Sequence, residues 1–400
     1  MDFNPELLQR ARKSLSMKIQ IESFMKMIDF PCHDPTGGIQ YIIVHFKNGG
    51  NKMSPIRSIP GRPSNKKTVW MVGLFVLIAV IGLLYVKWWP YYHKAFSAAD
   101  KHSIGSSILN MEGNGPSWGS ALQYAQAYFK SVWKAAVLGI LLGSLVQVLL
   151  PTGWLYEKLG KAGFKSTLIA GVSSLPGMMC TCCAAPIATG LRKRNVSVGA
   201  ALAFWLGNPL LNPATLIFMA FVLSWKFMLM RIVFGILLTF GVSYFANRFA
   251  GEAKMPESMA ALPEDKGDQA PFLVRWLKSL GMMLVSVVPA YLIAVLLLGA
   301  FQSTMFPVWV GGGIAAVIVF AVVGTLFVIP TAAEIPIIQS FLALGMGTGP
   351  AAALLVTLPA ISLPSVLIAW KAFPKKVLAF VSVSVVVAGI VSGLIGAWIL

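Results

Sequence analysis

Long apolar blocks separated by short polar segments make up most of the chain. A helix needs about 20 apolar residues to cross a bilayer. Each apolar block of that length is expected to be a transmembrane helix. After a polar leader at 1–67, such blocks lie at 68–87, 121–150, 226–249, 272–301 and 376–400. The leader is expected to be cytoplasmic, and Met53 within it is, by hypothesis, an alternative start that precedes a basic segment.

The stretch from 164 to 194 is apolar but too interrupted for one regular span. As a helix, Phe164–Gly177 reaches only about 21 Å, which is short of the hydrocarbon core of about 30 Å. The apolar pattern resumes at Ala184–Leu191 and ends in Arg192–Arg194, and lysines precede the whole stretch. Basic residues mark cytoplasmic ends. This favours a re-entrant hairpin with its tip at Met178–Pro186 near mid-membrane, and one broken span is the alternative.

A second interrupted segment follows at Val196–Leu223. It is long enough to cross the membrane, but Gly207-Asn208-Pro209 and Asn212-Pro213 break its helical pattern. Irregular backbone at membrane depth is tolerated only where it is buried in protein or lines a cavity. The residues expected to shape the hairpins and broken helices are Pro176, Gly177, Pro186, Pro209, Pro213, Thr331, Pro336 and Pro359.

The chain contains an internal repeat at a shift of 150 residues. Residues 121–250 and 271–400 share matched prolines and the same order of apolar runs, and residues 251–270 form a charged, presumed cytoplasmic linker. Each copy makes three full crossings and one hairpin, so the second copy is expected to be inverted relative to the first. Inverted repeats with discontinuous helices are typical of secondary transporters.

The predicted fold is therefore an all-α polytopic membrane protein. Two inverted repeats, each with a re-entrant hairpin and a broken helix, follow one extra N-terminal transmembrane helix at 68–87 and an extracytoplasmic loop at 88–120. This arrangement places the N-terminus in the cytoplasm and the C-terminus outside the plasma (inner) membrane. A homo-oligomer is compatible with it.

Composition supports a membrane protein. The 400 residues are 57% hydrophobic and 12% charged, whereas soluble domains carry roughly 25% charged residues. The net charge of +18 is explained by basic cytoplasmic loops, and no motif indicates nucleic-acid binding. All four histidines precede the repeats and there is no Walker A motif, so neither a His-rich zinc site nor ATP hydrolysis is expected. We expect no cofactor, and the expected partners are the lipid bilayer and a small-molecule or metalloid substrate.

Three cysteines, Cys180, Cys182 and Cys183, lie at the tip of the first hairpin. Thiolates are soft ligands that suit thiophilic species. Cys180 and Cys183 share one helix face, and Cys182 then points elsewhere. The three thiols are candidate ligands of a soft metalloid. The alternative is that they only pack between helices, as small residues do.

Polar residues in the apolar segments complete the candidate site. Glu334 is the one acid within an apolar segment of the repeats, and an intramembrane carboxylate is a functional candidate by default. It is expected to bind a cation or carry a coupling proton, or to form a capping box with Thr331. Asn208 and Asn212 are expected to contact substrate or to cap the broken helix ends.

These residues also resemble those of a known family. Cys180-Thr181-Cys182 with Pro186, the segment that begins at Gly199, and Asn208-Pro209 with Asn212-Pro213 are similar to the signature of the ArsP/YraQ-type permeases, with coverage from about residue 68 to the end. Characterised relatives of the ArsP kind export trivalent organoarsenicals, and the resemblance implies that Cys180 and Cys182 take the paired-cysteine positions. Cys183, Met178 and Met179 depart from the usual pattern.

The sequence therefore predicts a secondary permease rather than an enzyme. It is expected to move a small solute, through efflux of a thiophilic species such as a trivalent arsenical. One alternative is a permease for another solute in which the cysteines are structural. Another is a membrane thiol oxidoreductase, which would need cysteines near an aqueous face.

Overall fold

The computed structural model describes residues 32–33, 39–40, 65–109, 116–250, 271–305 and 313–400. The chain divides into two compact units, 1–65 and 66–400. In the first unit, the two-residue strands β1 (Cys32–His33) and β2 (Ile39–Gln40) pair antiparallel. Met53, most of the leader and the whole 251–270 linker lie outside the described residues.

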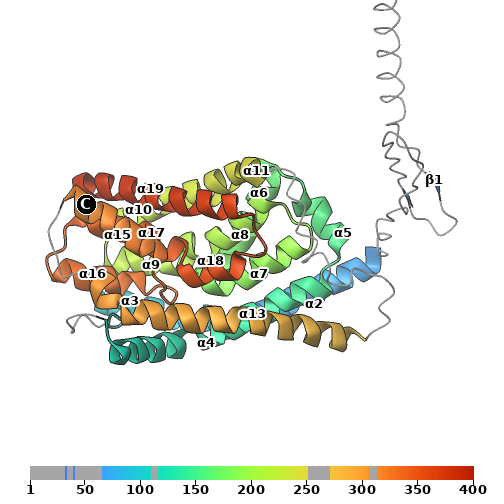
Figure 1. The fold of residues 1–400 in the computed structure, drawn as a ribbon, viewed down its shortest axis with the longest axis horizontal. Helices are drawn as coiled ribbons and strands as arrows, with labels where there is room; N and C mark the ends of the chain where they lie inside the picture. Colours follow the sequence, from blue (N-terminus) through green and yellow to red (C-terminus); the bar gives the residue numbers. More distant parts are fainter. Residues whose placement is uncertain (1–31, 34–38, 41–64, 110–115, 251–270, 306–312) are drawn as a thin grey trace, which may run out of the picture. The chain divides into compact units, whose positions relative to one another are not determined.

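Helices make up the described part of the second unit (Figure 1). The first half contains α2 (Asn65–Leu83), α3 (Trp89–Lys101), α4 (Trp118–Leu149), α5 (Thr152–Leu155), α6 (Phe164–Ser174), α7 (Thr181–Lys193), α8 (Val198–Leu210), α9 (Pro213–Val222), α10 (Trp225–Ile236) and α11 (Ser243–Ala250). The second half contains α13 (Phe272–Ala300), α14 (Gln302–Met305), α15 (Ile314–Leu326), α16 (Glu334–Ala343), α17 (Thr348–Ala360), α18 (Leu363–Ala369) and α19 (Lys375–Ile399).

Seven helical segments among the described residues are long and apolar enough to cross a membrane. They lie at Thr68–Lys101, Trp118–Leu149, Val198–Val222, Trp225–Ala250, Phe272–Ala300, Thr348–Ala369 and Lys375–Ile399. Length and apolar composition thus support the prediction of a multi-pass membrane protein. The shorter helices α15 and α16 are also apolar, as expected for the two arms of a hairpin.

The prediction of a loop from residue 88 is wrong for its first part. The helix continues from α2 through a π-helical turn at Leu84–Trp88 into α3, which ends at Lys101. Pro90 lies in the first turn of α3. The wider turn before it accommodates a proline ring and its missing N–H, which would otherwise break the helix.

The predicted breaks are shorter in the structure than in the sequence pattern. Pro186 lies inside α7 rather than in the hairpin tip. Pro209 lies inside α8, so Gly207-Asn208-Pro209 is not an interruption, and the break is confined to Leu211-Asn212. A proline lacks an N–H but still fits a helix whose lost hydrogen bond is replaced by neighbouring groups.

The two repeats contain corresponding helices. Both bounds of α17 lie 150 residues after those of α8, and the starts of α15, α18 and α19 lie 150 residues after those of α6, α9 and α10. The helical register therefore supports a repeated unit, while the inversion stays a prediction.

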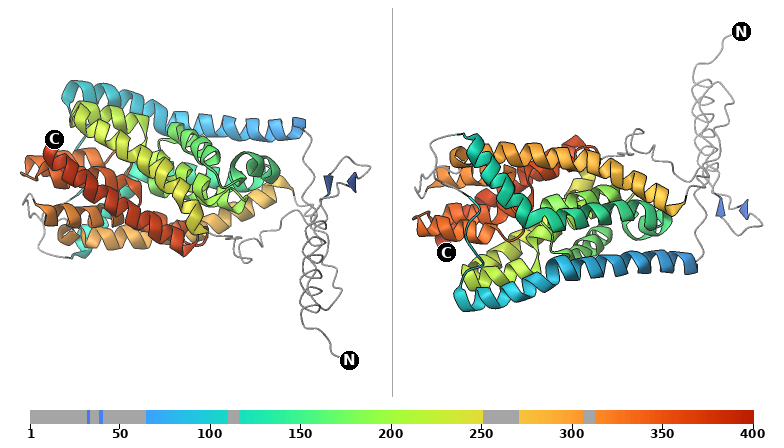
Figure 2. Two further views of the ribbon diagram at one scale, coloured as in Figure 1. Left: turned by 90° about the horizontal axis from the view of Figure 1, so that it is seen from above. Right: turned by 90° about the horizontal axis from the view of Figure 1, so that it is seen from below.

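Several pairs of helices join the two repeats. Helix α4 packs along its counterpart α13, as the lower part of Figure 1 shows, and α8 contacts its counterpart α17. The second arm of each hairpin contacts the broken helix of the other repeat: α7 contacts α18, and α16 contacts α9. By contrast, the long helix formed by α2 and α3 runs along one side of the bundle (Figure 2), and 6% of its most apolar window is buried.

Two glycines of α4 let the first hairpin approach closely. A Cβ at Gly139 would lie 2.3 Å from the carbonyl oxygen of Cys183, and one at Gly143 would lie 2.8 Å from the carbonyl oxygen of Pro186. The absence of side chains there allows the backbone of α7 to rest on α4. Small residues serve this purpose in membrane helix packing.

We expect Gly139→Ala to displace α7 and to lower the free energy of unfolding by about 1–3 kcal/mol, the usual cost of overpacking. The measurement is thermal unfolding of the purified protein in detergent. Gly73→Ala is the matched control, because a Cβ at Gly73 meets nothing within 4 Å. Equal stability of the two variants would contradict the close approach.

Candidate functional site

The first hairpin turns between α6 and α7. A 3-10 turn at Leu175–Gly177 ends α6, Met178 adopts a left-handed φ of 49°, and Cys180 is the N-cap residue of α7. A Cβ at Gly177 would lie 2.1 Å from Oδ1 of Asn208. A larger residue would push the Asn208 amide aside, so glycine lets the hairpin tip lie close to α8.

The second hairpin turns between α15 and α16. Its break runs from Phe327 to Ala333 and contains Ala332, whose φ is 69°. No side chain caps α16 at Ala333, so the expected capping box between Thr331 and Glu334 is wrong. Pro336 lies in the first turn of α16, where a missing N–H costs no helical hydrogen bond.

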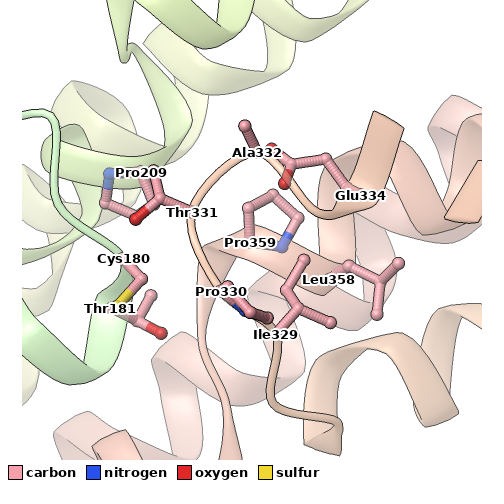
Figure 3. A pocket seen from close by; sticks show the side chains of 10 residues that line it. All are labelled: Cys180, Thr181, Pro209, Ile329, Pro330, Thr331, Ala332, Glu334, Leu358 and Pro359. Atoms are coloured by element: carbon pink, nitrogen blue, oxygen red, sulfur yellow. The ribbon is translucent and has the colours of Figure 1, made fainter. Parts of the chain in front are cut away.

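A pocket lies between the two hairpin tips, shown from close by in Figure 3. Two residues from the N-terminal end of α7 and the break before α16 form one part of its wall, and the last turns of α8 and α17 form the rest. Its lining residues are Cys180, Thr181, Pro209, Ile329, Pro330, Thr331, Ala332, Glu334, Leu358 and Pro359. Both repeats therefore contribute to one small site.

The three thiols at this site are buried and free. Sγ of Cys180 lies 2.9 Å from Sγ of Cys183, while Sγ of Cys182 lies 3.2 Å from Oγ of Ser362 in the second repeat. The hydroxyl of Tyr291 donates to Sγ of Cys183 over 3.9 Å. Cys180 and Cys183 thus form a pair on one face, and Cys182 points toward α18. In the described part of the chain, no three His, Cys, Asp or Glu side chains are grouped as a metal site.

The two asparagines have different surroundings. Oδ1 of Asn212 accepts hydrogen bonds from the backbone N–H groups of Ala214 and Thr215, at 3.1 and 3.3 Å, and so caps α9. Nδ2 of Asn208 donates to the Phe204 carbonyl oxygen at 2.8 Å, and its buried Oδ1 has no hydrogen-bond partner. Asn212 is therefore a helix cap, and Asn208 offers an unused acceptor beside the hairpin tip.

Glu334 forms a buried ion pair that joins the repeats. Its Oε1 lies 3.4 Å from Nη2 of Arg231 on α10, and the two side chains are 2% and 0% exposed. Its other oxygen, Oε2, has no hydrogen-bond partner. The carboxylate of the pocket is thus neutralised from one side and open on the other.

Arg231 also binds carbonyl oxygens that prolines leave without a helical donor. In a helix each carbonyl accepts from the N–H four residues later, but Pro213 and Pro359 have none. Nη2 of Arg231 donates to the Pro209 carbonyl at 2.9 Å, and Nη1 donates to that of Leu355. Nε donates to the Leu210 carbonyl at 2.9 Å. One guanidinium therefore serves the broken ends of α8 and α17 together.

The helix outside the repeats reaches both hairpin tips through adjacent residues of its π-helical turn. Nε1 of Trp88 donates to the Pro176 carbonyl at 2.8 Å, and Nζ of Lys87 donates to Oγ1 of Thr331 at 3.0 Å. The hydroxyl of Tyr124 on α4 donates to the Val328 carbonyl. π-Helical turns are frequently found at functional sites.

The structure therefore places some of the predicted site residues in the pocket wall and others behind it. Cys180 and Glu334 line the pocket, and Cys182, Cys183 and Asn208 are buried close behind it. Sequence reasoning missed Lys87 and Arg231. Arg231 could have been identified from the sequence, because a basic residue inside an apolar span needs a partner. Lys87 could not, because lysines beside tryptophans are also common at the interfacial ends of membrane helices.

We expect Arg231→Met to lower the free energy of unfolding by about 3–5 kcal/mol, because it leaves a buried carboxylate and three carbonyls unpaired. Glu334→Gln should cost less, about 1–3 kcal/mol, because the amide oxygen still accepts from Arg231. Denaturant unfolding in detergent measures both, and Lys226→Met, an exposed lysine on the same helix, is the control. Equal costs for the two buried variants would mean that the carbonyl contacts contribute little.

Comparison with known proteins finds one matching family and two relatives. The model of the ArsP_1 family, described as "Predicted permease", matches residues 117–397. UPF0718 protein YraQ of Escherichia coli (strain K12) is 50% identical over 328 residues, which cover 81% of this chain and 94% of that protein. UPF0718 protein MJ0584 of Methanocaldococcus jannaschii is 23% identical over 300 residues, 58% of this chain and 82% of that protein. No solved structure matches.

The family match spans both hairpins, both broken helices and the pocket between them. The seven apolar helical segments found among the described residues agree with a multi-pass membrane protein, and the family name agrees with a transporter rather than an enzyme. The chain therefore belongs to the ArsP_1 family of predicted permeases.

Proposed function

We propose that this permease works by alternating access and exports a small thiophilic solute, such as a trivalent arsenical, across the plasma membrane. The observation that carries the proposal is the group of three buried thiols where helices of both repeats end. Sγ of Cys180 and Sγ of Cys183 are 2.9 Å apart beside the pocket, and Cys182 faces Ser362 of the other repeat. A solute held between these thiols would contact both repeats at once.

The inverted relation of the repeats belongs to the same proposal. Each repeat would cross the membrane an odd number of times, so that the second copy starts from the opposite side. The exchange of contacts, α7 with α18 and α16 with α9, supports a two-fold relation. In transporters of this kind, rocking of one repeat against the other exposes a central site alternately to each side.

Inversion predicts that the C-terminus is outside and the 251–270 linker is in the cytoplasm. Alkaline phosphatase needs disulfides, which form outside the cytoplasm. We therefore expect a fusion after residue 400 to be active and a fusion within the linker to be inactive in an Escherichia coli host. A fluorescent-protein fusion at the same two places, which needs the cytoplasm, should give the reverse pattern. Active phosphatase at both places would contradict the inversion.

We further propose that export is coupled to an ion gradient through Glu334. Its carboxylate lines the pocket with one oxygen unpartnered, and its other oxygen pairs with Arg231. Protonation would remove its charge and weaken the contact between α16 and α10. The broken helix ends that Arg231 holds would then be free to rearrange with the hairpin.

A thiol oxidoreductase is the second candidate function. The specific observation in its favour is the Cys-x-x-Cys arrangement of Cys180 and Cys183 at the start of α7, with sulfurs 2.9 Å apart. Thiol–disulfide exchange requires access to the attacking thiol, however, and these side chains are 5% and 0% exposed. The burial of both thiols therefore favours a transporter over an oxidoreductase.

The test is accumulation in a metalloid-sensitive bacterial host. We expect wild type to lower accumulation of at least one of arsenite, methylarsenite and mercuric ion. Cys180→Ser with Cys182→Ser should abolish this difference, because a hydroxyl is a poor ligand for soft species. Cys32→Ser, which removes the one cysteine of the leader, should leave transport unchanged.

Membrane expression of all variants must be equal for this comparison. If no compound distinguishes wild type from empty vector, the thiophilic substrate is wrong and only the permease architecture stands. If the double variant transports as well as wild type, the cysteines are packing residues and the solute is of another kind.

A further inference from the structure

Lys87 is a buried cation that hydrogen-bonds a residue of the pocket wall. It lies on the helix outside the repeats and is 5% exposed. Its ammonium donates to the hydroxyl of Tyr91 at 3.2 Å and to that of Thr331, which lines the pocket, at 3.0 Å. The side chain is thus held at the second hairpin tip rather than extended to the membrane surface.

No described carboxylate forms an ion pair with Lys87. Within the described ranges from 65 to 400, Glu157 pairs with Lys158, and Glu334 pairs with Arg231. A buried charge is costly unless an opposite charge compensates it. With Arg231 and Glu334 cancelling each other, the site keeps one positive charge when the neighbouring thiols of Cys180 and Cys183 are protonated, and that state suits an anion.

Two helix ends add to this positive potential. The N-termini of α7 and α16 border the pocket, and neither is capped by a side chain. Uncapped N–H groups and the helix dipole make the end of α7 favourable for anions. At α16, Ile335 already donates to the Ala332 carbonyl and Pro336 has no N–H, so there the dipole is the main contribution. These helix ends occur together with the buried ammonium of Lys87, so they contribute to one site rather than acting alone.

The remaining groups restrict what kind of anion fits. Oε2 of Glu334 lines the same pocket without a hydrogen-bond partner, so a bound anion must offer it a donor rather than another negative oxygen. The thiol pair of Cys180 and Cys183 favours a soft atom. A hydrogen-bearing oxyanion with a soft central atom satisfies all three groups.

We propose that Lys87 is a substrate-binding residue and that the pocket takes a small hydrogen-bearing oxyanion whose central atom carries a lone pair. Its negative oxygen faces Lys87 and Thr331, its O–H donates to Oε2 of Glu334, and its soft atom faces the thiols. This inference rests on the proposed function as a permease for a thiophilic solute. It adds the charge of the solute and the residue that selects it.

The test is binding by the purified full-length protein in detergent with a thiol reductant. Sulfite at pH 6.5 is the soft hydrogen-bearing anion, and sulfate and phosphate are the hard comparisons. We expect sulfite to raise the melting temperature in a saturable manner and the two hard anions to have little effect. Isothermal titration calorimetry gives the dissociation constant.

Lys87→Gln removes the charge while keeping a donor for Thr331, so it separates charge from packing. We expect it to weaken sulfite binding at least tenfold while the melting temperature without ligand stays close to that of wild type. Lys87→Arg should keep most of the affinity. Lys94→Gln, an exposed lysine on the same helix, is the matched control and should bind like wild type.

The proposal is overturned if sulfite does not bind, if Lys87→Gln binds it as tightly as wild type, or if sulfate binds equally well. These outcomes are independent of the accumulation assay, which uses uncharged arsenicals and a mercuric salt. Saturable sulfite binding without arsenical export would retain this inference and remove the arsenical substrate. Arsenical export without sulfite binding would do the opposite.

Discussion

The need to pair every polar backbone group inside a membrane governs this structure. Prolines in α9 and α17 remove two helical donors at the depth where water is scarce, and the guanidinium of Arg231 supplies replacements for the Pro209 and Leu355 carbonyls. The same side chain pairs with Glu334. A single residue of the first repeat thus stabilises the broken helices of both repeats and the second hairpin, and the pocket exists where these elements end.

Much of the fold follows from hydropathy and proline positions. The apolar runs specify their helices because only helices satisfy the backbone in lipid, and the register between α8 and α17 follows from matched sequence. The extent of the breaks does not follow. From the sequence alone, Pro186 and Pro209 are expected to break helices, but both lie inside helices. Likewise the polar, aromatic residues after Lys87 indicate a loop, and the structure continues the helix to Lys101.

The site was predictable where a residue is unusual for its surroundings. Cysteines beside a glycine and an acid within an apolar run are such residues, and Cys180 and Glu334 line the pocket. Partners that come from distant elements were not predictable. Lys87 meets Thr331 across 244 positions of sequence, and no local pattern contains that contact. Asn212 had two equal interpretations, and only its hydrogen bonds identify it as a helix cap.

The contacts of Lys87 and Trp88 have a consequence for how the protein is assembled. Their helix precedes both repeats in the chain, and its anchors, Pro176 and Thr331, are 88 and 244 residues further along. Its C-terminal part also packs on α9, where the rings of Tyr91 and Phe218 lie 5.6 Å apart, while most of its apolar window is not buried. The helix can therefore dock on the first repeat early, but Lys87 keeps only the Tyr91 hydroxyl of its own helix as a partner until the second repeat has been inserted. Completion of this contact would be a late event in biogenesis, and a truncated chain that lacks the second repeat would leave that lysine without Thr331.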